Sequence, residues 1–444
     1  MSLMEVLPRQ SSAERSARER RRKDVELRTF RLLDEIFDQS SDTVGVRLWN
    51  GKVWPDDAPR PATLVLQHPG ALAKMFSAGT EAGVAEAYIY NDFDIEGDID
   101  MVFDLADGLL VRLGDWKEKL KLAGLLLGLP HGGPRQPSGV LPHLTGARHL
   151  PERDREAVTF HYDLSNEFYR LWLDRRMVYS CAYFESPDES LDKAQEQKLD
   201  YLCAKLRLLP GQRLLDFGCG WGGLILHAAE HFGVHGTGIT LSQRQADLAR
   251  ERIRAKELHE TVEVRVCDYR DLSKEAEKYD AAVSVGMAEH VGREQLPNYF
   301  AIARSLLRPR GVFLNHAIGE GVIPRPDNTA GSFIDRYVFP DGDIPPLPIM
   351  LGAAESAGFE IRDVENLREH YALTLRHWLR RLEARRDEAL AFVSEETYRI
   401  WRLYLAGSAH GFRRGRLAVY QTLLTNLDES GSGNLPLTRR DWYA

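Results

Sequence analysis

The chain has 444 residues, of which 43% are apolar and 28% charged, a composition typical of a soluble globular protein of about two domains. Its 58 basic and 66 acidic residues give a net charge of −8, which argues against nucleic acid as a partner. Four cysteines without CxxC spacing argue against a zinc site or a disulfide framework, so we expect no metal and a reducing cytoplasm. The charged N-terminus predicts no signal peptide, and no apolar stretch is long enough to cross a bilayer.

Residues 1–129 are predicted to form a small N-terminal α+β domain whose role is binding. Residues 14–23 carry six positive and two negative charges, and apolar residues from Leu27 to Phe37 recur at near-helical spacing, which predicts an amphipathic helix over 20–38. Two interpretations stay open: a solvated tail on a helix docked against its own domain, or a patch that touches anionic membrane. No set of catalytic residue types stands out in this part of the chain.

A linker is predicted over residues 130–150, because the stretch from Pro130 to Pro142 contains four prolines and three glycines. A segment rich in proline and glycine forms neither a helix nor a central strand of a sheet. Residues 151–444 are predicted to form the catalytic domain, which begins with a helical region over about 152–207. The chain is therefore expected to divide into a binding part and a catalytic part.

The catalytic domain is predicted to contain a parallel sheet, because short apolar runs alternate with helical segments of about 10–15 residues. The expected strands are Arg213–Phe217, Val234–Ile239, Val262–Cys267, Ala281–Val285, Val312–His316, Phe359–Val364 and Leu417–Thr425. The expected helices are Leu224–Phe232, Ser242–Lys256, Gln295–Leu307, 372–390 and 395–406.

The first of these strands ends in a glycine-rich turn, Asp216-Phe217-Gly218-Cys219-Gly220-Trp221-Gly222-Gly223. Glycines let the backbone approach a ligand closely, and the helix that follows offers unpaired N–H groups. The turn lacks the third glycine of the dinucleotide fingerprint and the lysine of a P-loop. It resembles the first motif of class I S-adenosylmethionine (SAM) methyltransferases, which implies an α/β, Rossmann-like fold with a seven-stranded sheet.

Ligands of open α/β sheets bind at the carboxyl ends of the strands, so the residues there are candidates for the binding site. After the glycine turn, these ends hold Thr240 and Gln245, Asp268 and Tyr269, and the runs 286–290 and 316–319. No acid follows the second strand, where a carboxylate commonly binds ribose hydroxyls. We therefore expect Thr240 and Gln245 to supply the polar contacts there.

Five more motifs occur in order along the catalytic domain. They are His161-Tyr-Asp-Leu-Ser-Asn166, Met177-Val-Tyr-Ser-Cys-Ala-Tyr-Phe184, Ser284-Val-Gly-Met-Ala-Glu-His-Val-Gly292, His316-Ala-Ile-Gly319 and Tyr337-Val-Phe-Pro340. Together with Thr-x-Ser-x-x-Gln after the second strand, they resemble the motifs of the cyclopropane-fatty-acyl-phospholipid synthases and of mycolic acid cyclopropane synthase-like methyltransferases. The match extends over about 155–425, and the N-terminal part resembles the lipid-binding domain of that family less distinctively.

The resemblance implies that the SAM methyl group is transferred to a cis double bond of an unsaturated phospholipid acyl chain and that the adduct closes to a cyclopropane. The alkene needs no deprotonation, but the resulting carbocation must be kept from water by an apolar, aromatic-walled pocket. A base must then remove one proton from the transferred methyl. In the family that base is a bound bicarbonate ion.

The resemblance assigns residues to two sets, and it implies no metal. The anion would be held by Cys181, Glu289, His316, the backbone of Ile318, and Tyr404. The SAM contacts would be Tyr179, Ser180, Gly218, Cys219, Gly220, Thr240, Gln245, Asp268 and Tyr269.

Taken one at a time, members of the first set have simpler interpretations. Cys181 could be a small buried hydrophobe, Glu289 part of an exposed loop, and His316 a fully hydrogen-bonded core histidine. Their occurrence together, in family order and at strand ends, favours a site. The sequence departs from the family at Ala288, where phenylalanine is usual, and at Ser408, where many members have a cysteine.

The sequence therefore predicts a SAM-dependent C-methyltransferase in the cytoplasm, bound peripherally to the inner face of the cell membrane. One alternative is the same lipid methylation without ring closure, which gives a methylene-branched chain. Another is a catalytically silent lipid-binding protein, and a small-molecule methyltransferase is disfavoured by the N-terminal domain. A homodimer is compatible with the sequence, which defines neither the double-bond position nor the headgroup.

Overall fold

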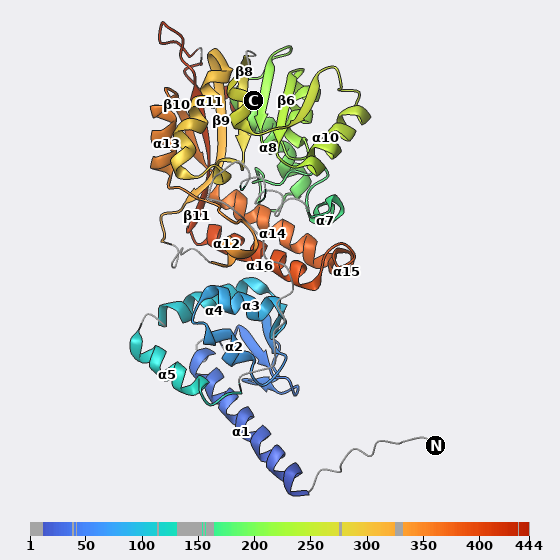
Figure 1. Cartoon of the computed structure of the whole chain (residues 1–444), viewed down its shortest axis with the longest axis vertical. Helices are drawn as coiled ribbons and strands as arrows, with labels where there is room; N and C mark the ends of the chain where they lie inside the picture. The colour runs from blue at the N-terminus through green and yellow to red at the C-terminus, as the bar shows by residue number, and fades with distance from the viewer. Residues whose placement is uncertain are drawn as a thin grey trace, which may run out of the picture. The chain divides into compact units, whose positions relative to one another are not determined.

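The structure is a computed structural model. It describes residues 12–37, 40, 42–112, 115–130, 153, 156, 164–274, 278–324, 332–433 and 435–443. The chain forms two compact units, Met1–Gly139 and Val140–Ala444 (Figure 1). All residues of the predicted linker after Pro130 lie outside the described residues, as do the first three residues of the motif that begins at His161.

The N-terminal unit combines a long helix with a small mixed sheet. Its elements are α1 (Ser12–Phe37), β1 (Val44–Arg47), β2 (Val53–Trp54), β3 (Ala62–Leu66), α2 (Ala71–Ser77), α3 (Glu81–Ile89), β4 (Phe93–Gly97), α4 (Ile99–Arg112) and α5 (Trp116–Leu126). The strands are ordered β2-β1-β3-β4, with β1 and β3 parallel and the other pairs antiparallel.

The C-terminal half of α1 docks on its own unit. Leu33 and Phe37 are buried, and the Phe37 ring packs against that of Trp54. Helix α1 is already formed at Ser12, earlier than the helical periodicity predicts, so the basic run 14–23 is helical. The apolar spacing marks only the part of the helix that the sheet covers, because the exposed part needs no apolar face.

The C-terminal unit is built on a sheet with seven strands among the described residues, in the order β10-β11-β9-β8-β5-β6-β7 (Figure 1). The strands are β5 (Arg213–Phe217), β6 (His235–Thr240), β7 (Val262–Val266), β8 (Tyr279–Val285), β9 (Leu307–Glu320), β10 (Glu360–Asn366) and β11 (Leu417–Thr425). Strands β9, β8, β5, β6 and β7 are parallel, whereas β11 pairs antiparallel with both β9 and β10. The predicted seven-stranded, Rossmann-like sheet is confirmed.

Helices of this unit connect the strands and pack beside them. They are α7 (Asn166–Trp172), α8 (Leu191–Leu206), α9 (Gly223–Phe232), α10 (Gln243–Ala255), α11 (Leu296–Leu306), α12 (Phe333–Tyr337), α13 (Leu347–Ser356), α14 (Arg368–Ala384), α15 (Arg386–Ala389) and α16 (Glu395–Arg413). Helices α14 and α16 pack against each other, and α7 packs on α14.

The predicted helical region over 152–207 is wrong for its middle part. Between α7 and α8 the chain is not helical, because the Asp174 carboxylate accepts hydrogen bonds from the N–H groups of Arg176 and Val178 and folds a turn. Ser190 then caps the start of α8. The segment between the two helices carries residues of the site.

The glycine turn after β5 is fixed against the neighbouring strand β6. The N–H groups of Gly218 and Cys219 both donate to the carbonyl oxygen of Ile239, at 3.0 and 2.8 Å. A Cβ atom added to Gly238 would lie 2.8 Å from both Cβ and Sγ of Cys219, closer than side chains pack. The absence of a side chain on β6 therefore lets the turn lie directly against the sheet.

This packing predicts that Gly238→Ala destabilises the protein by about 1–3 kcal/mol, the usual cost of an overpacked interior. Gly352→Ala is the matched control, because an added Cβ there has no atom within 4 Å and the residue is inside α13. We expect that control to be neutral or stabilising by up to about 1 kcal/mol. Urea denaturation compares the two, and equal effects would contradict the proposed close contact.

Candidate active site

The glycine turn presents backbone, not side chains, to a pocket at the carboxyl ends of the strands. Gly220 has a φ of 54°, in the left-handed region that glycine adopts without strain. A Cβ atom added there would point into open space, with the Gln245 amide nitrogen nearest at 4.0 Å. Any larger residue would therefore project into the pocket and strain the backbone.

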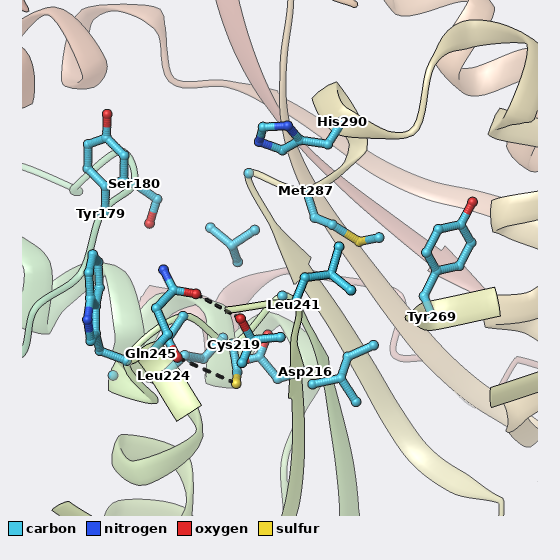
Figure 2. A pocket seen from close by; sticks show the side chains of 18 of the residues that line it. Tyr179, Ser180, Asp216, Cys219, Leu224, Leu241, Gln245, Tyr269, Met287 and His290 are labelled. Carbon is cyan, nitrogen blue, oxygen red and sulfur yellow. Dashed lines mark hydrogen bonds between the residues drawn. The ribbon is translucent and has the colours of Figure 1, made fainter. Parts of the chain in front are cut away.

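The pocket gathers residues that the sequence places far apart (Figure 2). Its empty space, including the open mouth, is about 1120 Å³. Its lining includes all the residues predicted to contact SAM: Tyr179, Ser180, Gly218, Cys219, Gly220, Thr240, Gln245, Asp268 and Tyr269. The structure thus brings together the residues indicated by the ends of β5, β6 and β7 and the two that only the family resemblance indicates, Tyr179 and Ser180 before α8.

Thr240 and Gln245 form a linked pair on the wall supplied by β6. The Thr240 hydroxyl donates to Gln245 Oε1 at 2.8 Å (Figure 2). The Ser242 hydroxyl caps α10 by accepting from the Gln245 backbone N–H. Because its oxygen is engaged, the Gln245 amide turns its nitrogen toward Gly220. The wall thus offers a hydrogen-bond donor where other nucleoside sites offer a carboxylate.

Asp268 and Tyr269 follow β7 at the next wall of the pocket. The Arg270 guanidinium donates to both carboxylate oxygens of Asp268, at 2.8 and 2.6 Å. The backbone N–H of Arg270 also donates to Asp268 Oδ1, at 2.9 Å. The guanidinium thereby fixes the carboxylate in one orientation. The Tyr269 ring packs edge-on against Tyr299, which fixes its position as well.

A buried lysine at the pocket wall was missed by the sequence reasoning. Lys198 of α8 is 1% exposed, and its ammonium donates to Ser180 Oγ at 2.9 Å. One turn earlier, the Gln195 amide donates to the Ser180 carbonyl oxygen at 2.9 Å. Burial lowers the pKa of Lys198 to about 8, while Asp174 acts in the opposite direction. These bonds hold the segment with Tyr179 in place at the pocket.

The spacing along α8 could have revealed this lysine. Positions 191, 195, 198, 202 and 205 recur every three or four residues and so share one helix face. Leu191 and Leu202 mark that face as apolar, which places Lys198 and Lys205 on the buried side. A lysine on such a face needs buried partners, and Asp216 is one, with a pKa that burial raises to about 7.

The Glu289 carboxyl, just after β8, is the centre of the second predicted set. Its Oε1 accepts the Ile318 N–H of β9 at 2.7 Å, and its Oε2 is buried with no hydrogen-bond partner in the described part of the chain. Burial raises the pKa of Glu289 to about 7. Burial also raises the pKa of Tyr404 to about 12, and the Glu289 charge adds to that shift, so the two groups are electrostatically coupled.

His316 precedes Ile318 by two residues on β9, so the two side chains share one face of the sheet. Its carbonyl oxygen accepts the N–H of Gly286, a residue of the pocket wall. Burial lowers the pKa of His316 well below its usual value, and Lys198 and Lys205 lower it further. The Nε2 atom is buried and has no partner among the described residues. A fully hydrogen-bonded core histidine would not leave this atom unpaired.

Cys181 has contacts of a different kind. Its buried thiol lies 3.3 Å from the carbonyl oxygen of Ala182 and 3.8 Å from that of Leu367 at the start of α14. Burial raises the pKa of the Cys181 thiol, as expected for an unreactive cysteine. These contacts match the simpler interpretation of a buried hydrophobe, and a role in holding an anion stays a prediction.

The two sets of residues meet at a pair of tyrosines. The Tyr179 hydroxyl, from the pocket wall, lies 3.4 Å from the Tyr404 hydroxyl of α16. Aromatic rings surround this contact and pack on one another: Tyr169, Trp172, Trp221, Trp378 and Trp401. The wall between the SAM pocket and the Glu289 group is therefore largely aromatic.

Both departures from the family pattern lie close to these groups. Ala288 is 1% exposed and belongs to the core cluster that contains Val291. Ser408 lies one turn after Tyr404 on α16, and its side chain hydrogen-bonds to the Tyr404 hydroxyl. Ser408 is thus placed to support Tyr404.

The fold and pocket define a class of protein. A seven-stranded Rossmann-like sheet with a glycine turn and a pocket at its strand ends is the architecture of class I SAM-dependent methyltransferases. A crystal structure of the mycolic acid cyclopropane synthase CmaA1 complexed with SAH and CTAB matches with a TM-score of 0.57 and 37% identity, over 61% of this chain and 98% of that chain. The protein is a SAM-dependent methyltransferase.

The sequence comparisons narrow this class to a family. The family model for mycolic acid cyclopropane synthetase matches residues 149–422, and the chain belongs to this family. It is 40% identical over 401 residues to a probable fatty acid methyltransferase of Pseudomonas putida, covering 90% of this chain and 95% of the relative. It is 33% identical over 375 residues to the cyclopropane-fatty-acyl-phospholipid synthase of Escherichia coli K12, covering 84% of this chain and 90% of the relative.

We expect Gly220→Val to weaken SAM binding by at least about 100-fold, or about 2.7 kcal/mol, because the added side chain would occupy the pocket. Gly211→Val is the control, since Gly211 also has a positive φ but does not line the pocket. Both variants carry similar backbone strain, so only a pocket effect separates them. Calorimetric titration measures the affinities, and a folded Gly220→Val protein with normal affinity would contradict the assignment.

Proposed function

We propose that the protein transfers the SAM methyl group to a cis double bond in the unsaturated acyl chain of a membrane phospholipid, and that the product is a cyclopropane. The observation that carries the proposal is a pair of buried polar atoms without partners, Glu289 Oε2 and His316 Nε2. Glu289 accepts the Ile318 N–H, and His316 lies two residues before Ile318 on β9. Tyr404, whose pKa the Glu289 charge raises, contacts Tyr179 of the SAM pocket. The family and the names of the relatives support the same reaction.

These groups fit a small planar anion such as bicarbonate. The Tyr404 hydroxyl and a protonated ring nitrogen of His316 would donate to the anion, and the Glu289 carboxyl would accept from it. The Ile318 N–H, which donates to Glu289 Oε1, would be shared with the anion or released to it. A buried polar group without a partner costs about 1–3 kcal/mol, which an anion bound here would recover. Bound bicarbonate would supply a base that exchanges with solvent.

The aromatic wall suits the other requirement of the reaction. A cation formed on the acyl chain reacts with any water in reach, so water must be excluded where the methyl is transferred. The rings of Trp401 and Tyr404 lie 5.7 Å apart at right angles, and Trp401 packs in turn on Trp172 and Tyr179. Aromatic faces also attract cations, which stabilises positive charge developing nearby.

A second product is favoured by one observation. The small, buried Ala288 directly precedes Glu289, where the family usually has phenylalanine. A smaller side chain could leave room for the acyl chain to turn, so that a hydride shifts from the methyl-bearing carbon to the neighbouring cationic carbon before the base acts. Removal of a methyl proton then forms a C=CH₂ group without closing the ring. The result would be a methylene-branched chain, an isomer of the cyclopropane. Proton NMR of the extracted lipid distinguishes the ring methylene of a cyclopropane from a C=CH₂ group.

Glu289→Gln should reduce cyclopropane formation at least about 100-fold and leave SAM affinity within about threefold, since the amide is isosteric but no longer a full acceptor. Lipid mass spectrometry and calorimetry measure the two effects. Near-normal cyclopropane output from this variant would remove Glu289, and with it the anion, from the reaction.

Ser408→Ala is the matched control from the same site. It removes one hydrogen bond to Tyr404, and such a bond contributes about 0.5–1.5 kcal/mol, so we expect activity to fall by no more than about tenfold. A loss as large as that of Glu289→Gln, with SAM binding intact, would instead indicate a catalytic role for the Ser408 hydroxyl.

We further propose that the N-terminal unit docks on an anionic phospholipid bilayer through α5 and the exposed half of α1. Trp116, Leu120 and Leu127 recur at spacings of four and seven residues, which places them on one face of α5 and its C-terminal end, and they are 65%, 63% and 79% exposed. No helix in the described part of the chain is long and apolar enough to cross a membrane. A surface contact is therefore the mode that these residues suit.

Positive charge accompanies this apolar stripe. The Lys117 ammonium lies 5.9 Å from the centre of the Trp116 ring, and residues 20–23 of α1 (Arg-Arg-Arg-Lys) are all exposed. Helix α5 lies against α1, because the Arg28 guanidinium donates to the Gly128 carbonyl oxygen (Figure 1). Tryptophan, leucine and basic residues on one surface are the composition of an interfacial membrane helix. The acidic chain thus carries a local basic and apolar surface.

We expect Leu120→Glu combined with Leu127→Glu to weaken binding to vesicles of phosphatidylglycerol and phosphatidylcholine at least tenfold, because two apolar contacts of about 1.5 kcal/mol or more are lost. Leu209→Glu is the control, a leucine of the C-terminal unit that is 62% exposed. Binding of the unchanged protein should also fall as salt rises above about 0.1 M, where the screening length is about 10 Å. Co-sedimentation that gives equal binding for all three proteins would contradict the docking surface.

A further inference from the structure

A chain of buried hydrogen bonds leads from α8 to His316. The Lys205 ammonium of α8 donates to Gln421 Oε1 at 2.8 Å, and Gln421 Nε2 lies 3.2 Å from His316 Nδ1. Gln421 and His316 are paired directly across β11 and β9. All three side chains are at most 2% exposed, so no water competes for these contacts.

The direction of each bond follows from the chemistry of its donor. A lysine ammonium has protons and no lone pair, so the atom of Gln421 that faces Lys205 must be the oxygen. The amide then turns its NH₂ group toward His316, and an NH₂ group can only donate. The Nδ1 atom of His316 must therefore be the acceptor. In the neutral ring, the proton is then on Nε2.

Lys205 itself cannot turn away from Gln421. It forms a short ion pair with Glu365, whose carboxylate also accepts the Tyr201 hydroxyl at 2.9 Å. The Lys205 ammonium also lies 4.4 Å from the centre of the Tyr201 ring and 5.3 Å from that of Trp442. Lys205, held in place by these contacts, thus fixes the orientation of the Gln421 amide.

The atom that receives the proton is the one without a partner. His316 Nε2 is buried and unpaired, so the relay directs an N–H group at a space where a ligand atom would complete it. The charged groups that act on the ring are Lys198 and Lys205, both on α8, and both oppose a second proton. The facing Gln421 amide also opposes it, because an imidazolium Nδ1–H would meet a donor.

We propose that Gln421, held by Lys205, is a positioning residue that keeps His316 in the neutral Nε2–H form, so that His316 donates a hydrogen bond in the active site and does not act as the base. The inference rests on the proposed function for what the N–H contacts, namely an anion oxygen. The position of the proton is independent of the proposed function, because it depends only on the contacts between Lys205, Gln421 and His316.

The position of the proton is measured directly by ¹⁵N NMR of histidine-labelled protein, with the His316 signals assigned by their loss in His316→Asn. We expect the unchanged protein to show the Nε2–H form throughout the range from about pH 6 to 8. Gln421→Glu replaces the donor by a carboxylate, which accepts from both Lys205 and Nδ1–H, and should move the proton to Nδ1. A proton on Nδ1 in the unchanged protein would overturn the proposal, whether or not the enzyme makes cyclopropanes.

The pH profile separates a positioning role from a structural one. At neutral pH we expect Gln421→Glu to lower kcat at least tenfold while SAM affinity stays within about threefold. As pH falls, its imidazole gains a second proton and regains Nε2–H, so the deficit should narrow. Gln421→Met, which offers neither donor nor acceptor, should show a deficit that does not change with pH. Equal profiles for the two variants, or full activity of Gln421→Glu at neutral pH, would overturn the proposal.

Should the carboxylate variant fail to fold, Lys205→Met provides a second test. Without the ammonium, the Gln421 amide is free to turn, and the His316 signals should then report a mixture of the two neutral forms. A single unchanged Nε2–H form in Lys205→Met would show that the relay does not set the proton. If the NMR results hold but no lipid product forms in any protein, the proposed function fails and the relay stands.

Discussion

The site depends on two lysine ammonium groups that α8 buries on one face. Lys198 anchors the wall of the SAM pocket, and Lys205 anchors the Gln421 amide behind His316. Taking an ammonium out of water costs several kcal/mol unless hydrogen bonds and opposite charge offset the loss. Each ammonium therefore tolerates only one arrangement of the polar groups around it. This requirement fixes the Ser180 side chain in one half of the site and the Gln421 side chain in the other.

The two halves come from distant parts of the chain and meet at one contact. Tyr179 belongs to the segment before α8, whereas Tyr404 belongs to α16, and their hydroxyl groups lie 3.4 Å apart. On one side is the pocket that takes the methyl donor, and on the other is the Glu289 carboxyl with its unpaired oxygen. Aromatic rings pack around the contact between the two halves. In the proposed reaction, methyl transfer and proton removal would be served by neighbouring but separate groups.

Sequence reasoning predicted the glycine turn and the ends of β5, β6, β7 and β8 well, because both follow from local rules of spacing and of sheet topology. Thr240 and Gln245 were found in this way even though the usual acid is missing. The predicted end of the next strand at His316 was wrong, because β9 continues to Glu320 in its pairing with β11, so His316 and Ile318 lie within the strand. Sequence reasoning also missed Lys198, although the helical spacing of α8 places that lysine on the buried face. It could not find Gln421, because the role of a buried glutamine depends on partners that are distant in the sequence. The helical region over 152–207 failed for a similar reason, since the turn at Asp174 is fixed by side-chain hydrogen bonds and not by periodicity.

The position of β11 in the sheet has a consequence for biosynthesis. This strand lies between β9 and β10, although both precede it in the sequence. A ribosome releases the glycine turn, Glu289 and His316 long before Gln421, so the nascent chain can assemble the methyl-donor pocket while the sheet is still open at β9. Only when the C-terminal strand inserts does His316 acquire its partner. If Gln421 positions His316 as proposed, quality control that degrades incomplete chains would meet a protein that holds the donor molecule but lacks the contact that completes the second half of the site.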